Sequence, residues 1–344
     1  MTPAVHAAAN LIGPHLAAVD DLFAAELRSD LPHVNALVTH VGRFRGKMLR
    51  PMLVLLSGLA AAPARPSPEE PDNHAAASPL SPPHITLATV VEMVHMATLV
   101  HDDILDDADV RRKGATINHL HGNEAAVLLG DFLISHAYHL CSSLRSNPNG
   151  QDYSRLIAHT TNVVCEGELT QNVNRRNWKL TEQTYFDIIY RKTAILTETC
   201  CRLGAMSSTS HRFAVEALAT YGKKVGLAFQ IVDDILDICG SQKAVGKSLG
   251  TDIEKGKLTL PMIHFLKHAA PQHRALLIDL LESAEHDRIE RVRQLISPSS
   301  SITYARRHAE NLIAEALAAL GTLPASSASA ALAEMAHFVT ARDR

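Results

Sequence analysis

The sequence predicts an all-α protein, and three observations support this prediction. Ala, Leu, Glu and Gln dominate most segments of the 344-residue chain. Residues of the predicted buried face recur at three- and four-residue spacing, as in Leu156, Ile157, Thr160, Val163 and Val164, which is the period of a helix with one buried face. Alternating β-branched runs bounded by hairpin turns are missing. We therefore expect a single helical domain over residues 1–344.

A proline-rich segment interrupts this helical pattern. Residues 62–83 contain Pro63, Pro66, Pro68, Pro71, Pro79, Pro82 and Pro83. Proline at this density cannot continue a helix, because it lacks the backbone N–H and its ring clashes with the preceding turn. We expect a long surface loop between two helices. A linker between domains is the alternative, and it is disfavoured because the motifs described below lie on both sides.

Composition limits the functional classes. The chain is 46% hydrophobic and 20% charged with a formal net charge of −3, so no global basic field favours nucleic-acid binding. The N-terminus lacks a basic segment before an apolar core, and no apolar run approaches the roughly 18 residues of a membrane span. Five cysteines without a CxxC pair fit thiols of a reducing compartment. We expect a cytoplasmic protein without stable membrane insertion.

One acidic motif occurs twice. Residues 102–106 are Asp-Asp-Ile-Leu-Asp, and residues 233–237 repeat the same five letters. Residues four apart share a helix face, so Asp102 and Asp106 point the same way, as do Asp233 and Asp237. Like charges at this spacing destabilise an isolated helix by about 0.2–0.5 kcal/mol, which a bound cation would offset. Oxygen-only ligands favour magnesium held together with substrate phosphates.

A solvated helix face is the alternative explanation for such a motif. Apolar residues precede both copies, however: Met96, Leu99 and Val100 before the first, and Leu227, Phe229, Ile231 and Val232 before the second. Carboxylates that emerge from core helices are costly unless they are paired. The double occurrence therefore favours a metal site.

Basic residues occur at discrete points that suit diphosphate groups. Arginine makes bidentate phosphate contacts, and lysine acts as a flexible point charge. Each of them alone is more often a surface cation, but together with two acidic clusters they predict an anion site. The candidates are Arg45, Lys47 and Arg50 beside Gly46, Arg111 and Arg112 after the first motif, Arg191 and Lys192 within a helix, and Lys247 and Lys257 around the turn at 250–252.

With these residues in place, the chain resembles the trans-isoprenyl diphosphate synthases, also called polyprenyl synthetases. The likeness runs from about residue 42 to residue 261, and it is specific because order and spacing match as well as residue type. It rests on residues 46–51, His95, residues 102–106 with Arg111 and Arg112, residues 130–132, 166–168, 192–194, 229–230 and 233–237, and residues 250–252 through Lys257.

The resemblance implies the isoprenoid synthase fold, a bundle of antiparallel helices around a central active-site cavity, usually in a homodimer. It implies about three Mg²⁺ per active site. Asp102 and Asp106 would bind two of these ions and Asp233 the third, with Asp237 acting through water. The implied catalytic residues are Asp102, Asp103, Asp106, Asp233, Asp234, Asp237 and Lys192.

The resemblance also assigns the substrates, isopentenyl diphosphate and an allylic diphosphate (geranyl, farnesyl or geranylgeranyl). Thr193 and Gln230 would lie beside the allylic diphosphate. The residues that would bind its phosphates are Arg111, Lys192, Lys247 and Lys257. The residues that would bind the diphosphate of isopentenyl diphosphate are Lys47, Arg50, His95 and Arg112.

The implied reaction is head-to-tail condensation to a longer all-trans polyprenyl diphosphate. Positive charge stabilises the departing diphosphate as the allylic C–O bond ionises, and the double bond of isopentenyl diphosphate attacks the cation. The proton is lost to the released diphosphate. Departures from the family pattern are small: Arg45 replaces a common glycine, Lys113 precedes Gly114, and the 62–83 loop is long.

Product length is expected to depend on the residues four and five positions before Asp102. These are Thr98 and Ala97, whereas short-chain members of the family typically carry Phe or Tyr at that depth. Small side chains predict a medium- or long-chain product. Met93 or Phe132 could instead close the product cavity at a greater depth. A geranylgeranyl-length product is a second alternative. Close helix packing equally explains the two small residues.

Three competing functions are weighed against chain elongation. Other magnesium-dependent terpenoid enzymes bind no isopentenyl diphosphate, which leaves Lys47, Arg50, His95 and Arg112 unexplained. A non-catalytic subunit of a heteromeric synthase is expected to lose one aspartate motif, and both are intact. A di-iron carboxylate bundle needs two Glu-x-x-His motifs, and the sequence offers Glu92 with His95 but no second copy.

Overall fold

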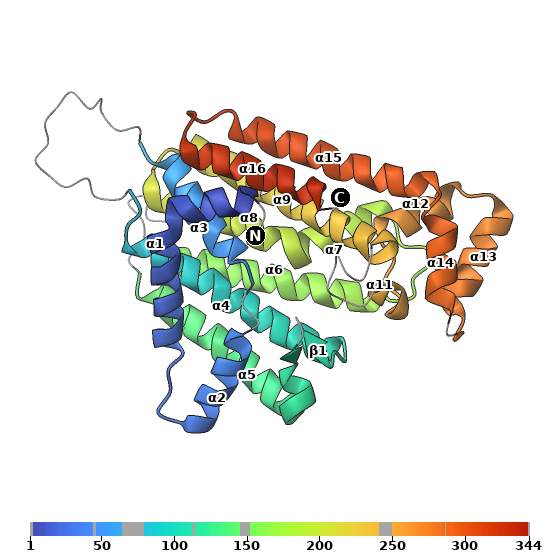
Figure 1. Cartoon of the computed structure of the whole chain (residues 1–344), viewed down its shortest axis with the longest axis horizontal. Helices are drawn as coiled ribbons and strands as arrows, with labels where there is room; N and C mark the ends of the chain where they lie inside the picture. The colour runs from blue at the N-terminus through green and yellow to red at the C-terminus, as the bar shows by residue number, and fades with distance from the viewer. Residues whose placement is uncertain are drawn as a thin grey trace, which may run out of the picture. The chain divides into compact units, whose positions relative to one another are not determined.

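A computed structural model describes residues 3–43, 46–63, 79–111, 114–144, 152–240, 250–285 and 287–342. Helices form nearly all of the described elements, which confirms the all-α prediction (Figure 1). They are α1 (Pro3–Glu26), α2 (Pro32–Gly42), α3 (Leu49–Ala61), α4 (Pro82–Leu105), α5 (Ile117–Ser142), α6 (Tyr153–Val173), α7 (Glu182–Ile189), the π-helical turn η1 (Tyr190–Ala194), α8 (Ile195–Ser208), α9 (Arg212–Cys239), α11 (Thr251–Glu254), α12 (Leu260–His268), α13 (Pro271–Glu282), α14 (Arg288–Ile296), α15 (Ser300–Leu320) and α16 (Ser327–Ala341). One short antiparallel pair, β1 (Val110–Arg111) with β2 (Gly114–Ala115), completes the described elements.

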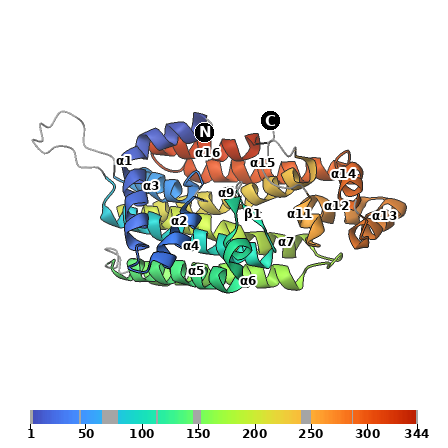
Figure 2. The same ribbon diagram turned by 60° about the horizontal axis from the view of Figure 1, so that its bottom comes forward.

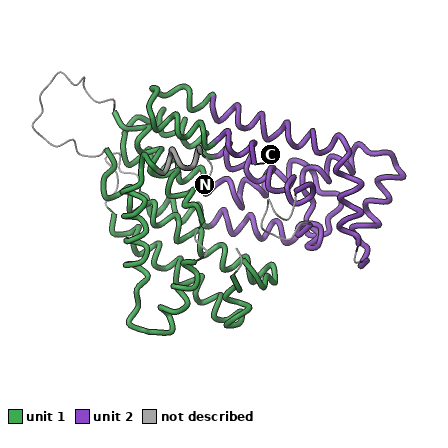
Figure 3. Tube along the Cα trace, viewed as in Figure 1, with its two compact units in different colours: residues 1–161, 197–222, 318–335 green, residues 162–196, 223–317, 336–344 purple. Residues whose placement is uncertain are grey.

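The chain divides into two compact units (Figure 3). Unit 1 comprises residues 1–161, 197–222 and 318–335, and unit 2 comprises residues 162–196, 223–317 and 336–344. The unit borders fall within α6, α8, α9, α15 and α16. The expectation of a single domain stays a prediction, and each unit is described by itself.

Unit 1 is built around α4. This helix lies along α5 and also packs against α1 and α3 (Figures 1 and 2). Its middle is buried on several sides, with Leu87, Val90, Val91 and Met93 fully inaccessible. Helix α3 approaches α8 so closely that a Cβ on Gly204 would lie 2.0 Å from the Val54 carbonyl oxygen. The first aspartate motif is therefore attached to a helix whose middle lies in the core of unit 1.

Helix α4 also corrects one expectation. By length and composition it is apolar enough to cross a membrane, with a mean hydropathy of 1.3 over an 18-residue window. Polar residues such as Glu92 and His95 interrupt this apolar run. However, 67% of the window is buried within the protein, as in a core helix.

Both ends of the proline-rich segment are described. Helix α3 ends at Ala61, and α4 begins at Pro82 after the N-cap Ser81. Two prolines in the first turn suit a helix start, because the N–H groups there have no partner within the helix. Residues 64–78 lie outside the described residues.

Unit 2 packs α12 against α7, α13 and α14. It also contains the C-terminal part of α9, which carries the second aspartate motif. The last carbonyl groups of this helix are capped by Arg293 of α14, whose guanidinium donates to the carbonyl oxygens of Ile238 (2.7 Å) and Gly240 (3.1 Å). This cap holds the end of α9 where its free carbonyl groups would otherwise require water.

Candidate active site

The first aspartate motif forms the C-terminal end of α4. Asp106 is the C-cap residue, and its N–H donates to the Asp102 carbonyl oxygen at 2.9 Å, so the two side chains are one turn apart. The helix dipole places negative potential at this end. Two carboxylates therefore add like charge to an already negative helix terminus, which favours a bound cation.

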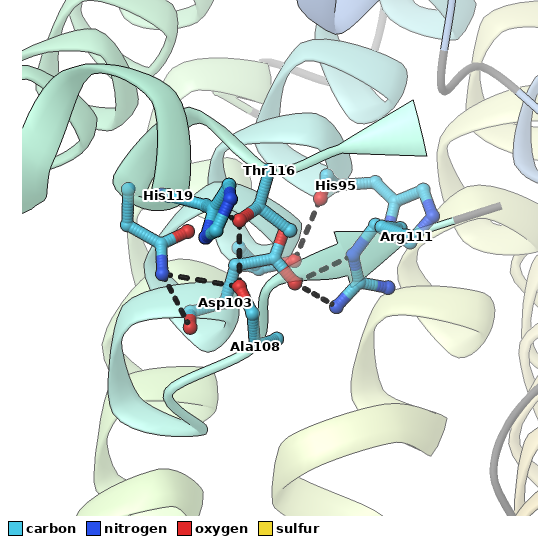
Figure 4. Close-up of polar contacts among 8 residues, drawn as sticks. His95, Asp103, Ala108, Arg111, Thr116 and His119 are labelled. Atoms are coloured by element: carbon cyan, nitrogen blue, oxygen red, sulfur yellow. Dashed lines mark hydrogen bonds and ion pairs between the residues drawn. The ribbon is translucent and has the colours of Figure 1, made fainter. Parts of the chain in front are cut away.

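The second residue of this motif, Asp103, has a different environment. Asp103 is 4% exposed, and the Nε and Nη2 of Arg111 each lie 2.7 Å from its Oδ1 (Figure 4). Asn118 donates to the Asp103 carbonyl oxygen at 3.3 Å, and Thr116 donates to the Ala108 carbonyl oxygen at 2.6 Å. Asp103 thus links α4 to β1 and to the start of α5. Arg111, assigned by the resemblance to the allylic diphosphate, contacts this carboxylate, and its substrate role stays a prediction.

The second motif lies in the last turns of α9. Asp233 remains one-third exposed, and its Oδ1 lies 2.7 Å from Nη1 of Arg342, whose guanidinium also covers the Phe229 ring at 4.5 Å. Asp237 accepts N–H groups from Thr251 (3.2 Å) and Asp252 (3.1 Å). Burial and the Asp252 charge raise the pKa of Asp237 to about 6.

Asp234 is buried like Asp103. It is 4% exposed; Tyr185 donates its hydroxyl to Oδ2 at 2.7 Å, and Gln230 donates Nε2 to Oδ1 at 2.9 Å. Burial, with a further contribution from Asp252, raises the pKa of Asp234 well above its usual range. In each motif the second of the three aspartates is therefore buried and held by neighbouring donors. The first and third aspartates of each motif remain more accessible.

A pocket in unit 2 brings five of the predicted residues together. Its cavity of about 100 Å³ is lined by Lys192, Thr193, Gln230, Asp234 and Lys257. Other lining residues are Gln171, Asn174, Tyr185, Asp252 and Thr259. Two lysines beside polar side chains make this pocket suitable for a phosphate group.

Lys192 reaches the pocket from a π-helical turn. Its Nζ contacts Glu168, and it donates to Oε1 of Gln171 at 2.9 Å. Beneath it, a Cβ on Gly167 would lie 2.7 Å from the Lys192 backbone nitrogen. Single π-helical turns occur frequently at functional sites, because the extra residue redirects side chains. Gly167 thus permits the close approach of α6 to η1 that brings Lys192 to Glu168.

Replacing Gly167 by Ala is expected to weaken this approach. The Cβ would meet backbone, which cannot move cheaply, so overpacking should cost about 1–3 kcal/mol of unfolding free energy and displace Lys192. We expect a lower Tm, and the resemblance implies a raised KM for the allylic diphosphate. Gly13→Ala is the matched control, because nothing lies within 4 Å of a Cβ there. Equal behaviour of the two variants would contradict the role given to Gly167.

The remaining predicted residues are placed only in part. Lys47 is exposed just before α3, Arg50 is half-buried in its first turn, and His95 is half-buried in α4, all in unit 1. Arg45, Arg112, Lys113 and Lys247 lie outside the described residues. Their roles, like those of the aspartates, stay predictions.

Four residues near these motifs were assigned no role from the sequence. Tyr185 precedes Lys192 by two helical turns, and this spacing could have placed both on one face. Glu168 and Asp252 fall within motifs that the resemblance quotes. Arg342 carries no sequence signal, because its contact with Asp233 depends on the tertiary fold.

The carboxylate oxygens of the two aspartate motifs suit magnesium that binds together with a phosphate-containing substrate. Within the described ranges, no group of three or more His, Cys, Asp or Glu residues is arranged to hold a metal ion. Magnesium requires only one or two carboxylates when phosphates complete its shell. The guanidinium of Arg342 against Asp233 indicates that this carboxylate accepts a cationic partner.

Paired Asp-Asp-x-x-Asp motifs at the ends of long helices, in an all-α protein, are typical of prenyl diphosphate synthases. The family model described as polyprenyl synthetase matches residues 32–298. Octaprenyl diphosphate synthase of Haemophilus influenzae is 34% identical over 334 residues, which cover 97% of this chain and 95% of that protein. The chain belongs to the polyprenyl synthetase family and is a prenyltransferase.

Solved structures agree with this assignment. A decaprenyl diphosphate synthase from Rhodobacter capsulatus has a TM-score of 0.86 and 30% identity and covers 99% of each chain. A polyprenyl synthase from Caulobacter crescentus, solved with calcium and isoprenyl diphosphate, has a TM-score of 0.85 and 30% identity and covers 99% of this chain and 98% of that one. The predicted isoprenoid synthase fold is confirmed.

Proposed function

We propose that this chain is a magnesium-dependent medium- or long-chain trans-polyprenyl diphosphate synthase. It condenses isopentenyl diphosphate with an allylic diphosphate, releasing inorganic diphosphate at each cycle. The pocket that joins Lys192 and Lys257 to the second aspartate motif carries this proposal. The similarity to an octaprenyl and a decaprenyl diphosphate synthase supports a long product.

The accessible aspartates would hold the metal ions. Asp102 and Asp106 would bind two Mg²⁺ and Asp233 the third, with Asp237 acting through water. Bound in this way, magnesium would supply positive charge to the leaving diphosphate. The buried Asp103 and Asp234 contribute by holding the local structure in which the accessible carboxylates lie.

Basic residues bind the two diphosphates separately. Lys192 and Lys257 bind the allylic diphosphate in the pocket, with Arg111 and Lys247 adding charge. Lys47, Arg50, His95 and Arg112 bind isopentenyl diphosphate. The allylic C–O bond breaks with its electron pair moving to the diphosphate. The isopentenyl double bond then forms the new C–C bond, and the proton leaves to the released diphosphate.

A homodimer is proposed from exposed apolar residues on two helices. On α5, Leu120 (48% exposed), Val127 (43%) and Leu128 (68%) are accessible, and on α6, Leu169 (66%) and Val173 (80%). Residues of this kind on helix faces favour contact with a second copy of the chain. Sedimentation analysis should give a dimer mass, and Leu128→Glu should lower it. A monomeric wild type would contradict this proposal.

A product assay tests the function. Purified protein is incubated with magnesium, labelled isopentenyl diphosphate and farnesyl diphosphate, and dephosphorylated products are separated by length. Products well beyond geranylgeranyl support the proposal. A stop at geranylgeranyl length would favour the short-chain alternative. No incorporation by folded protein with any allylic starter would favour a non-catalytic subunit of a heteromeric synthase.

The cell compartment is a further part of the proposal. The burial of α4 supports a cytoplasmic enzyme without stable membrane insertion. Cell fractionation tests this: recovery in the membrane pellet after a high-salt wash would contradict it.

Arg342 offers a test of metal binding at Asp233. Its guanidinium competes with a cation for Oδ1, so Arg342→Ala should lower the magnesium concentration at half-maximal rate. A partly exposed ion pair contributes about 0.2–1 kcal/mol, which corresponds to a shift of up to about fivefold. Arg274→Ala, at an exposed position of α13, removes the same charge as a control. A higher magnesium requirement in Arg342→Ala would contradict competition at Asp233.

A further inference from the structure

Tyr185 is a buried tyrosine in the wall of the unit 2 pocket. It is 3% exposed, and its hydroxyl donates to Oδ2 of Asp234 at 2.7 Å. Burial raises the pKa of Tyr185 well above its usual range, so the hydroxyl keeps its proton and acts as a donor. Tyr185 therefore lines the pocket and also holds a second lining residue, Asp234.

Two further hydrogen bonds connect Asp234 to Thr193. Gln230 donates Nε2 to Oδ1 of Asp234 at 2.9 Å, and Thr193 donates its hydroxyl to Oε1 of Gln230 at 2.9 Å. The donor and acceptor roles in these two hydrogen bonds depend on one another. An amide group that turns its nitrogen toward a carboxylate turns its oxygen the other way, and this oxygen can only accept. Thr193 must then be the donor.

The orientation of Thr193 has a chemical consequence. Its only hydroxyl hydrogen is committed to Gln230, so the oxygen presents lone pairs and no donor to its remaining neighbours. An oxygen of this kind stabilises positive charge better than negative charge. Because Thr193 also lines the cavity, its oxygen suits the carbon that becomes cationic as the diphosphate departs.

We propose that Tyr185 is a positioning residue for prenyl transfer. By holding Asp234 in one orientation it fixes the amide of Gln230, and the amide fixes Thr193 as an acceptor toward the allylic carbon. This inference rests on the proposed function of the pocket. The Tyr185 hydroxyl is committed to Asp234 and acts through Asp234, Gln230 and Thr193.

The test is Tyr185→Phe, which removes the hydroxyl and keeps the ring. Loss of a hydrogen bond that orients a functional side chain typically lowers activity by about 10–100-fold. We expect kcat to fall about tenfold, whereas KM for farnesyl diphosphate and its dissociation constant by calorimetry should change less than about twofold. Tyr221→Phe is the matched control: Tyr221 is also fully buried, and its hydroxyl donates to the Leu332 carbonyl oxygen at 2.6 Å in unit 1.

Two variants of Thr193 test whether the Tyr185 hydroxyl acts by orienting Thr193 or only by packing in the core. In Thr193→Val the hydroxyl is gone, so adding Tyr185→Phe should lower kcat by less than about twofold. In Thr193→Ser the hydroxyl is kept, and the full loss of about tenfold should return. The same loss in Tyr185→Phe and Tyr221→Phe, or an equal loss in both Thr193 backgrounds, would overturn the inference. A wild type that transfers no prenyl group would instead contradict the proposed function.

Discussion

Replacing Asp102 by Asn is expected to lower kcat by about 10³-fold at saturating magnesium. The residue lies one turn before the C-cap Asp106, where the helix dipole already disfavours negative charge. Its carboxylate is therefore best explained as a ligand for a cation. Asparagine keeps the shape of the side chain but removes the charge that would bind magnesium under the proposed function. The measurement is single-turnover formation of product over a range of magnesium concentrations.

Asp107→Asn is the matched control for this substitution. Asp107 is exposed and follows the motif directly, with a positive φ of 45° that asparagine tolerates well. The control removes the same charge just after the helix end and should retain most of the activity. If Asp102→Asn and Asp107→Asn lost activity equally, net charge near α4 would matter rather than a metal ligand at Asp102.

The sequence was sufficient to predict helices and both motifs because these depend on local spacing. The four-residue interval in each motif places two aspartates on one face whatever the tertiary fold. Lys192 and Thr193 could be connected to Gln230 and Lys257 only through the family likeness, and the unit 2 pocket does bring these four residues together.

The different environments of the aspartates could not be predicted in the same way. Asp103 is buried because Arg111 and Asn118 close over it after the chain turns through β1 and β2. Asp234 is buried because Tyr185 of α7 packs against α9. These contacts join different secondary-structure elements, and no periodicity within one helix encodes them.

The π-helical turn at η1 was also not predicted. Helical periodicity continues through Tyr190–Ala194, and Arg191 and Lys192 appear as two adjacent cations. In the structure they diverge: Arg191 pairs with Asp187 and Glu166, whereas Lys192 contacts Glu168 and lines the pocket. One extra residue in the turn determines which of them serves the site.

Replacing Ala97 by Phe should shorten the product to geranylgeranyl length or below. Ala97 is fully buried in α4, and the helix continues from it to the first aspartate motif. A growing chain attached at the diphosphate must extend away from that motif, so a ring added one turn before it would meet the chain early. The measurement is the length distribution of products from farnesyl diphosphate.

Overpacking is the competing explanation for any loss at this position. Adding a ring to a filled core costs about 1–3 kcal/mol wherever it is placed. Ala88→Phe controls for this, because Ala88 is equally buried in the same helix but farther from the motif. Both variants should have a lower Tm, but only Ala97→Phe should shift the distribution toward short products. If products shorten equally in both, damage to α4 explains the change; if neither shortens them, another helix sets the length.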